Sequence, residues 1–379
     1  MSDLIPAAEF EERLSKVRAG MPSKGLDALF LFSQKRSHVG YISGYRPNYH
    51  TNSAVVLLPL EKEPVLWIKF PFDLPRAKSM SWFTDIRCSA SEEQERMVAQ
   101  CAETIRSLDL DRSLIGVVAS DLAVDELSVS VSEALRRNLP NAQFESASDL
   151  VNGIRLIKSK NEIALLRTAA QLAELVADDF RKAIRPGVKD RAAAAAADQS
   201  ARTEGAEDCS IILSRGPAHM ALPPDGSEFQ RGDQVTCEIT VRYRGYWVQI
   251  CRVFSIGSPS AEQREIFAVC RSAYEAAVAI AQPDKPVGDL AEAAYQAIVN
   301  GGYKDYVQYG TGHGVGLDLP ELYPLDPHCK DPLGSGMILV IHPAIWVPGR
   351  GTAFVGGPIA VSDGKAMRLD NPQSEIIAI

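Results

Sequence analysis

The second half of the chain repeats one order of secondary-structure elements. Apolar residues recur at helical spacing over 156–184 and 188–204, and runs typical of β-strands follow them. The same order, two helical segments and then strands, returns between residues 259 and 364. A repeat of this kind predicts an α+β domain that is built from two similar halves.

The first half of the chain has a different organisation. Predicted strands and helices alternate in it, and adjacent strands are mixed with crossover helices, which is typical of an α/β unit with a mixed sheet. Within it, the segment 39–47 is predicted to be a strand followed by a turn. A chain of 379 residues is also too long for one ordinary core. We therefore expect two domains, at 1–152 and 153–379.

Charge and composition exclude several classes of partner. The formal net charge is -8, so we expect no basic face for nucleic acid or for an anionic membrane. No apolar run approaches the about 18 residues of a membrane span. The seven cysteines include no CxxC pair, and the N-terminal segment lacks a basic stretch followed by an apolar one. These features predict free thiols and a cytoplasmic protein that binds neither nucleic acid nor membrane.

One histidine stands in a glycine-rich stretch, YGTGHGVGLDLP, at 309–320. His313 has a glycine on either side, so that backbone and a ligand can both approach its imidazole. A histidine needs partners for chemistry: carboxylates if it binds a metal, or a substrate and an orienting group if it moves protons. The stretch therefore predicts a functional site whose other members lie elsewhere in the sequence.

Four passages resemble one family, that of creatinase, prolidase and aminopeptidase P. They are LVNGIRLIKSKNEIALLRTAAQLAE, FQRGDQVTCEITVRYRGYWVQICRVF, GTGHGVGLDLPE, and SGMILVIHPAIW followed by GGPIAVSDG. They occur in the family's order and span residues 150–364. The resemblance implies a C-terminal pita-bread domain, a smaller N-terminal α/β domain of the creatinase type, and a homodimer.

The residues at the positions of the family's metal ligands differ from the family's pattern. The family's peptidases hold two divalent metals with two aspartates, one histidine and two glutamates. The matching positions here are, in chain order, Glu238, Gln249, His313, His342 and Gly356. Two neighbouring dications need several negative charges around them, and one carboxylate remains. We therefore expect no metal cofactor; a single zinc or ferrous ion held by Glu238, His313 and His342 is the alternative.

Two further positions differ from the family's pattern. In RGPAHMALPPDG, Pro224 takes the place of a histidine that acts near the substrate, and His219 lies close before it. Cys251 takes the place of a creatinase glutamate. It alternates with Gln249 on a predicted strand, so both side chains face the same side. Cys251 is then either a thiol that contacts or attacks the substrate, or a small buried core residue.

The segment 40–53 supplies a second set of candidates. In creatinase the corresponding segment reaches the active site across the dimer, and an arginine in it holds the substrate carboxylate. The matching position here is Asn52, and Arg46, Tyr49 and His50 are near enough in the sequence to replace that arginine. The alternative is a turn with polar surface residues.

Together these residues predict a metal-independent, creatinase-like hydrolase or lyase. Its substrate is a small polar, carboxylate-bearing amidine, amide or amino-acid derivative, in which a C–N bond is broken. His313 and His342 move protons, Glu238 orients them, and Gln249 hydrogen-bonds the substrate. The volume that Gly356 leaves free holds part of the substrate, or else the glycine marks a β-bulge.

Two other functions stay open. One is an Xaa-Pro metallopeptidase of the prolidase or aminopeptidase P type, with a reduced metal site. The other is a non-catalytic protein that uses the same cleft for recognition.

Overall fold

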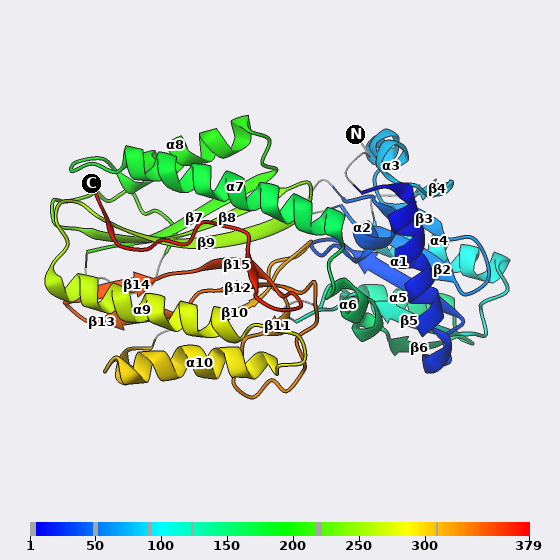
Figure 1. Cartoon of the computed structure of the whole chain (residues 1–379). Coiled ribbons are helices and arrows are strands. Elements are labelled where there is room, and N and C mark those ends of the chain that lie inside the picture. Colours follow the sequence, from blue (N-terminus) through cyan, green and yellow to red (C-terminus); the bar gives the residue numbers. More distant parts are fainter. Residues whose placement is uncertain (1–4, 48–51, 90–92, 123–124, 217–221, 308–309) are drawn as a thin grey trace. The chain divides into compact units, whose positions relative to one another are not determined.

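The chain divides into two compact units, one up to Arg155 and one from Leu156. Figure 1 shows the course of the chain through both units. The computed structural model describes residues 5–47, 52–89, 93–122, 125–216, 222–307 and 310–379. The boundary that the sequence places after residue 152 falls inside the last helix of the first unit, α6 (Ser148–Arg155).

A six-stranded sheet forms the centre of the N-terminal unit. Its strands are β1 (Ala28–Ser33), β2 (Ala54–Pro59), β3 (Val65–Ile68), β4 (Asp85–Cys88), β5 (Leu114–Val118) and β6 (Gln143–Ser146). They are ordered β4-β3-β2-β1-β5-β6, with antiparallel β1–β2 and β2–β3 pairs and parallel β1–β5, β3–β4 and β5–β6 pairs. The other α-helices of this unit are α1 (Ala7–Gly20), α2 (His38–Ser43), α3 (Leu74–Met80), α4 (Gln94–Ser107) and α5 (Val129–Asn138). The sheet is mixed, as the alternation of strands and helices predicts.

The segment 39–47 is not a strand. It contains most of α2, and every residue of this helix is buried. Side chains tie the short helix locally: the Val39 amide donates to Ser33 Oγ at 3.0 Å, and Ser43 Oγ donates to the Val39 carbonyl at 2.7 Å. A short helix that is buried on all sides has no polar face, so its sequence pattern cannot be told from that of a buried strand.

The C-terminal unit contains the repeat that the sequence predicts. Its helices are α7 (Lys160–Ala183), α8 (Asp190–Thr203), α9 (Ala261–Ile280) and α10 (Val287–Asn300). The first helix of each pair begins with the same device, a capping box, formed by Ser159 with Glu162 in α7 and by Ser260 with Gln263 in α9. Within this unit, Figure 1 shows the strands between the α7–α8 pair and the α9–α10 pair.

The strands of this unit form two main sheets. One has the order β17-β9-β8-β7 and contains β7 (Asp208–Arg215), β8 (Gln234–Tyr243), β9 (Tyr246–Ser255) and β17 (Ile377–Ala378). The other has the order β11-β10-β12-β15-β16 and contains β10 (Gly312–Gly314), β11 (Glu321–Pro324), β12 (Ile338–Ile341), β15 (Gly357–Ala360) and β16 (Met367–Arg368). A separate hairpin pairs β13 (Ala344–Val347) with β14 (Gly351–Phe354).

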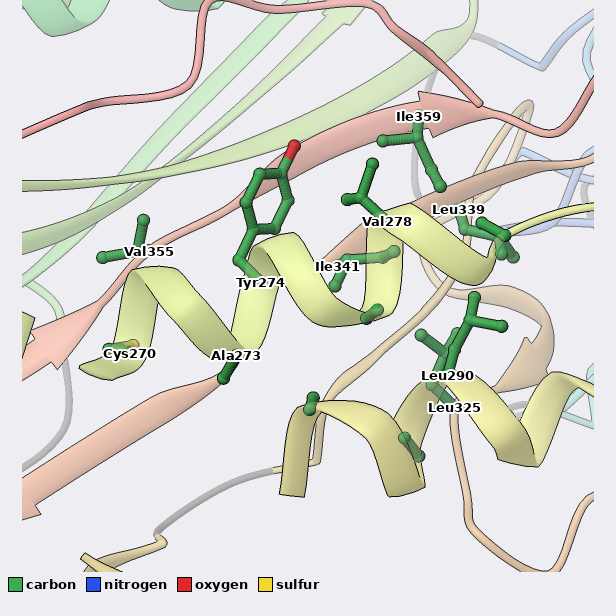
Figure 2. Packing of buried hydrophobic residues seen from close by; sticks show 14 of the residues in the cluster. Cys270, Ala273, Tyr274, Val278, Leu290, Leu325, Leu339, Ile341, Val355 and Ile359 are labelled. Carbon is green, nitrogen blue, oxygen red and sulfur yellow. The ribbon is translucent and has the colours of Figure 1, made fainter. Parts of the chain in front are cut away.

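An apolar core supports the second of these sheets from the side of α9 and α10. Figure 2 shows Tyr274 and Val278 of α9 close to Ile341 of β12 and Ile359 of β15, and all four side chains are buried. A close-packed interior has low compressibility, so this packing holds the strands in place. The sheet is therefore a firm support for the residues that β10 and β12 carry.

Candidate active site

Four of the predicted site residues meet in the C-terminal unit. Glu238 lies on β8 and Gln249 on β9, and the strand register places both on one face, because Glu238 is opposite Cys251 and Thr240 is opposite Gln249. Gln249 hydrogen-bonds the Glu238 side chain. Its amide also lies 3.1 Å from Nε2 of His313, which belongs to β10 in the other sheet. The His342 ring, directly after β12, has its centroid 5.3 Å from that of His313.

The glycines beside His313 serve strand packing. A Cβ atom at Gly312 would overlap the Val340 carbonyl oxygen of the neighbouring strand β12, and one at Gly314 would overlap the Leu322 carbonyl oxygen. Only glycine allows backbones to approach this closely. The two glycines that flank His313 are therefore required by β10 itself, and their presence alone does not indicate a ligand.

The contacts of His313 define its tautomer. Nδ1 lies 2.9 Å from the Gly314 carbonyl oxygen, which only accepts hydrogen bonds, so Nδ1 carries a proton and donates. Burial lowers the pKa of His313, against a smaller opposite effect of that hydrogen bond, and this favours a neutral ring. In the neutral ring Nε2 is an acceptor, and its partner must be the NH2 group of the Gln249 amide.

Gln249 links His313 to Glu238 in one of two consistent arrangements. If the Gln249 carbonyl oxygen faces His313 and its NH2 group faces a carboxylate, the imidazole must be protonated on both nitrogens. If the amide is flipped, both His313 and Glu238 are neutral, and the acid donates to the amide oxygen. Burial raises the pKa of Glu238, partly offset by the Gln249 hydrogen bond, and it lowers the pKa of His313, so the neutral arrangement is favoured. The two arrangements differ by the transfer of one proton from His313 to Glu238 and by a flip of the Gln249 amide.

His342 is a fully buried neighbour of His313, without exposed surface for a substrate to contact. It is fully buried, and its ring packs edge to face on Phe354, with centroids 5.2 Å apart. Burial, together with the charge that His313 can carry, lowers the pKa of His342 to about 3. The expectation that His342 moves protons is therefore not met by its position. We assign it a packing role beside His313.

The pH dependence of the free energy of unfolding should show whether the folded protein keeps the buried His342 ring neutral. The folded protein keeps this ring neutral down to about pH 3, whereas the unfolded chain protonates it near its ordinary value of 6.5. Between these values the unfolded chain binds more protons, so stability falls as the pH falls, by about 2 kcal/mol between pH 7.5 and pH 5. Urea unfolding at both pH values should show a drop that is smaller by this amount in His342→Leu. Equal drops in the two proteins would show that His342 is not held neutral.

Cys251 is a core residue in this structure. It is fully buried in a small cluster with Ala344 and Phe354. Burial raises the pKa of its thiol well above the ordinary value, and a thiolate is therefore not available. Neither a nucleophilic role nor direct substrate contact fits a side chain without exposed surface, so the core alternative describes Cys251.

Gly356 does not leave an open volume. A Cβ atom at this position would overlap the Ile341 carbonyl oxygen and lie 2.8 Å from the His342 Cα atom. The backbone of 341–342 occupies the space that the sequence assigns to a substrate. Gly356 instead forms an isolated β-bridge with Cys251, whose amide donates to the Gly356 carbonyl at 2.9 Å. This bridge joins the two main sheets.

The remaining predicted residues lie outside the described residues or in the N-terminal unit. Tyr49, His50 and His219 lie outside the described residues. Arg46 belongs to the N-terminal unit, where its carbonyl accepts a hydrogen bond from Arg76 at 2.6 Å. Asn52 is buried in the same unit, and its Nδ2 donates to the Asp73 carboxylate at 3.0 Å.

Three buried charged side chains near the site were not predicted from the sequence. Lys158 and Glu321 form an ion pair of 2.7 Å, and Glu321 also accepts from the Asp318 amide at 3.0 Å, which holds the turn after His313. The pair joins residues 163 positions apart, so no local pattern announces it. Arg252 lies on β9 and is 4% exposed. An arginine within the apolar run QICRVF is the sequence signal that could have identified it.

The residues in the site do not fit a pair of divalent metal ions. Glu238 is its one carboxylate, and burial raises the pKa of that group. Gln249 is engaged with His313 and Glu238, and Gly356 offers neither a ligand nor room for one. Among the described residues there is no group of three or more histidine, cysteine, aspartate or glutamate side chains that could hold a metal ion. Such a pair needs several negative charges.

The comparisons with known proteins identify the family. Residues 164–363, more than half of the chain, match the model of metallopeptidase family M24. The chain belongs to metallopeptidase family M24. Residues 13–157 match the creatinase/prolidase N-terminal domain, so the expected two-domain α+β architecture, with a creatinase-like domain followed by a pita-bread domain, is confirmed.

Several named relatives of this M24 protein are dipeptidases. An Xaa-Pro dipeptidase of Pyrococcus furiosus is 28% identical over 66% of this chain and 73% of its own. The putative dipeptidase YkvY of Bacillus subtilis is 26% identical over 97% of this chain and 99% of its own. The solved structure of an Xaa-Pro dipeptidase from Bacillus anthracis superposes with a TM-score of 0.86 at 24% identity, over 98% of this chain and all of the other.

These findings correct the predicted function and cofactor. The expectation of a metal-independent, creatinase-like reaction is wrong, because the matching family is one of metallopeptidases and the named relatives include Xaa-Pro dipeptidases. The same match overturns the expectation that no metal cofactor belongs to the protein. The departure of the site from a metal-binding set remains as a property of this member of the family.

Proposed function

We propose that this protein hydrolyses the peptide bond before proline in dipeptides or other short peptides. The observation that supports this most is the similarity to Xaa-Pro dipeptidases, which for the Bacillus anthracis structure extends over 98% of this chain. His313 stands on a strand of that shared fold, in contact with the polar side chain of Gln249.

His313 is the residue that we propose to handle protons in this reaction. Hydrolysis places a hydroxyl group on the carbonyl carbon and a proton on the proline nitrogen as the C–N bond breaks. Nε2 of His313 is held by a side-chain amide, whereas Nδ1 is held by the backbone, so Nε2 is the nitrogen that water or substrate can take over. A neutral imidazole can accept a proton there and return it to the leaving nitrogen.

Gln249 and Glu238 keep that imidazole ready for the reaction. The amide fixes the direction of Nε2, and Glu238 fixes the amide through its own hydrogen bond. In metallopeptidases a bound metal activates the attacking water. Because the described residues do not fit a metal pair, we assign no step to a metal and restrict these roles to positioning and proton transfer.

Proline release from dipeptides tests the proposal. Purified protein is incubated with a panel of Xaa-Pro dipeptides and with the matched Xaa-Ala dipeptides, each with added Mn²⁺ and each after treatment with a chelator. We expect release of proline to exceed release of alanine. The chelator arm reports whether the family's metal requirement persists in a site with one carboxylate. Absence of proline release under every metal condition would contradict the proposal.

Recognition without catalysis is the second candidate. One observation favours it: only one carboxylate remains at the positions that match the family's metal ligands, so the site differs from a dinuclear metal site. Saturable binding of Xaa-Pro dipeptides in calorimetry, with no product over the same period, would support it. Turnover would exclude it.

Assembly and location stay predictions. A homodimer follows from the resemblance alone, and size measurement in solution by light scattering would test it. A cytoplasmic location is proposed from the cysteine pattern. In the part of the chain that the structure describes, no helix is both long and apolar enough to cross a membrane.

A further inference from the structure

The candidate active site is assembled across the join between two sheets. Gln249 comes from the β9 sheet and His313 from the β10 sheet. The distance between their side chains therefore depends on how these sheets are joined. Two residues after Gln249, Cys251 makes the bridge to Gly356, with an N–O distance of 2.9 Å. We call this bridge the sheet seam.

Arg252 binds the sheet seam from the face opposite to the site. Side chains alternate along β9, so Arg252 points away from the face that carries Gln249 and Cys251. Its Nη1 donates to the carbonyl of Cys251 at 2.9 Å and to the carbonyl of Gly356 at 3.3 Å. One guanidinium nitrogen thus contacts both strands of the bridge.

The second terminal nitrogen of this guanidinium, Nη2, is anchored to two further segments. Nη2 donates to Glu174 of α7 at 2.5 Å, to the Asp370 carboxylate at 3.0 Å and to the Asn371 carbonyl at 3.1 Å. Glu174 also accepts from the Asn371 amide at 2.9 Å. The Asp370 side chain is fully buried and that of Arg252 is 4% exposed, so these charge-assisted bonds are shielded from water. A planar guanidinium is pre-organised for several acceptors at once, which an ammonium is not.

We propose that Arg252 is a positioning residue for the candidate active site, and that it acts by fixing the sheet seam and hence the Gln249–His313 hydrogen bond. Its anchors in α7 and in the segment after β16 hold the guanidinium still. The guanidinium in turn holds the two backbone carbonyls of the seam. The effect of Arg252 on the reaction rate rests on the proposed function, whereas its effect on the geometry of His313 does not.

Histidine NMR can read that geometry directly. The chain has six histidines, so 15N-histidine labelling gives a small set of ring signals that single substitutions can assign. Arg252→Lys keeps the charge but loses the planar fork. We expect it to shift the ring signals of His313 and to leave those of the exposed His328 unchanged. Leu290→Ala is the control, because it removes a buried side chain of α10, which lies in the apolar core and away from the seam.

Kinetics supply the second readout. Misplacement of a catalytic group by about 1 Å can cost about 100-fold in rate. In Arg252→Lys we expect kcat for an Xaa-Pro dipeptide to fall by about 10- to 100-fold. KM should stay close to the wild-type value, because Arg252 touches no substrate. A purely structural defect, as in Leu290→Ala, should lower the amount of folded enzyme without this change in the kcat of the folded fraction.

The outcomes separate this inference from the proposed function. If Arg252→Lys does not fold, Glu174→Gln weakens one anchor while retaining the guanidinium, and it should shift the His313 signals in a smaller degree. His313 signals that match the wild type in both variants, or that move equally in Leu290→Ala, would overturn the role of Arg252. Lack of turnover in the wild type would overturn the proposed function, and the NMR comparison would still decide the inference.

Discussion

Replacing His313 by alanine is expected to lower kcat/KM for an Xaa-Pro dipeptide by about 100- to 10,000-fold, the range over which a positioned acid–base group contributes. Nε2 of His313 lies 3.1 Å from the Gln249 side-chain amide, so this ring nitrogen faces a polar side chain. Alanine removes that nitrogen while leaving β10 intact. Steady-state proline release by wild type and variant at equal folded concentration measures the effect.

Two controls make the His313 result specific. His328→Ala removes an exposed imidazole of the same unit and should retain wild-type activity. A His313→Ala, Gln249→Leu double variant should lose little more than His313→Ala alone, because residues that act through one another are not additive. Activity of His313→Ala within a few-fold of wild type would remove this residue from the reaction. Strictly additive losses would show that Gln249 does not act through His313.

The architecture could be predicted from the sequence because it is encoded locally. Helical spacing, capping boxes and the change from helices to strands recur in both halves of the C-terminal unit, and each signal lies within one element. The helix α2 could not be predicted, because its stability comes from burial on all sides and from serine hydrogen bonds to Val39. Tertiary context decided the structure of that segment.

The site could be predicted only as far as strand alternation reaches. Alternation places Glu238 and Gln249 on one face, and the glycine-rich stretch identifies His313. Strand alternation does not show which segment of backbone packs against that face. Alternation left two alternatives for Cys251, and the structure shows the buried one, because Cys251 is covered where β9 meets Gly356. His342, expected to face the substrate, is enclosed between two rings. The Lys158–Glu321 pair joins distant segments, which no local pattern records. Arg252 does have a local signal, its place in an apolar run, but that run does not indicate its partners.

The packing around Gly356 changes how the site should be compared with its family. The chain has not merely lost a ligand side chain at this position, because the backbone of 341–342 has closed on the glycine. Restoring an acidic side chain there would first require the strands to separate. The differences at His342 and Gly356 are therefore coupled through one backbone contact, and reverting either of them alone should not recreate a metal-binding set.

Gly356→Ala tests that closure directly, and we expect it to lower the free energy of unfolding by about 3 kcal/mol. The added methyl group would overlap the Ile341 carbonyl oxygen and press on the His342 Cα atom, and both are backbone that cannot rotate away. For a domain of this size the loss corresponds to a fall in Tm of about 6 to 12 °C. Differential scanning calorimetry of the C-terminal transition measures it.

Gly310→Ala is the matched control for this prediction. It adds the same methyl group in the same unit, before the strand that carries His313, and meets nothing within 4 Å. Its stability should stay within about 0.5 kcal/mol of the wild type. Because Gly356 bridges Cys251, the Gly356→Ala protein should also show displaced His313 ring signals, whereas the Gly310→Ala protein keeps its fold and its seam. A Gly356→Ala protein as stable as Gly310→Ala would mean that the strands around 341–342 can open, and the site would then have room for a side chain at position 356.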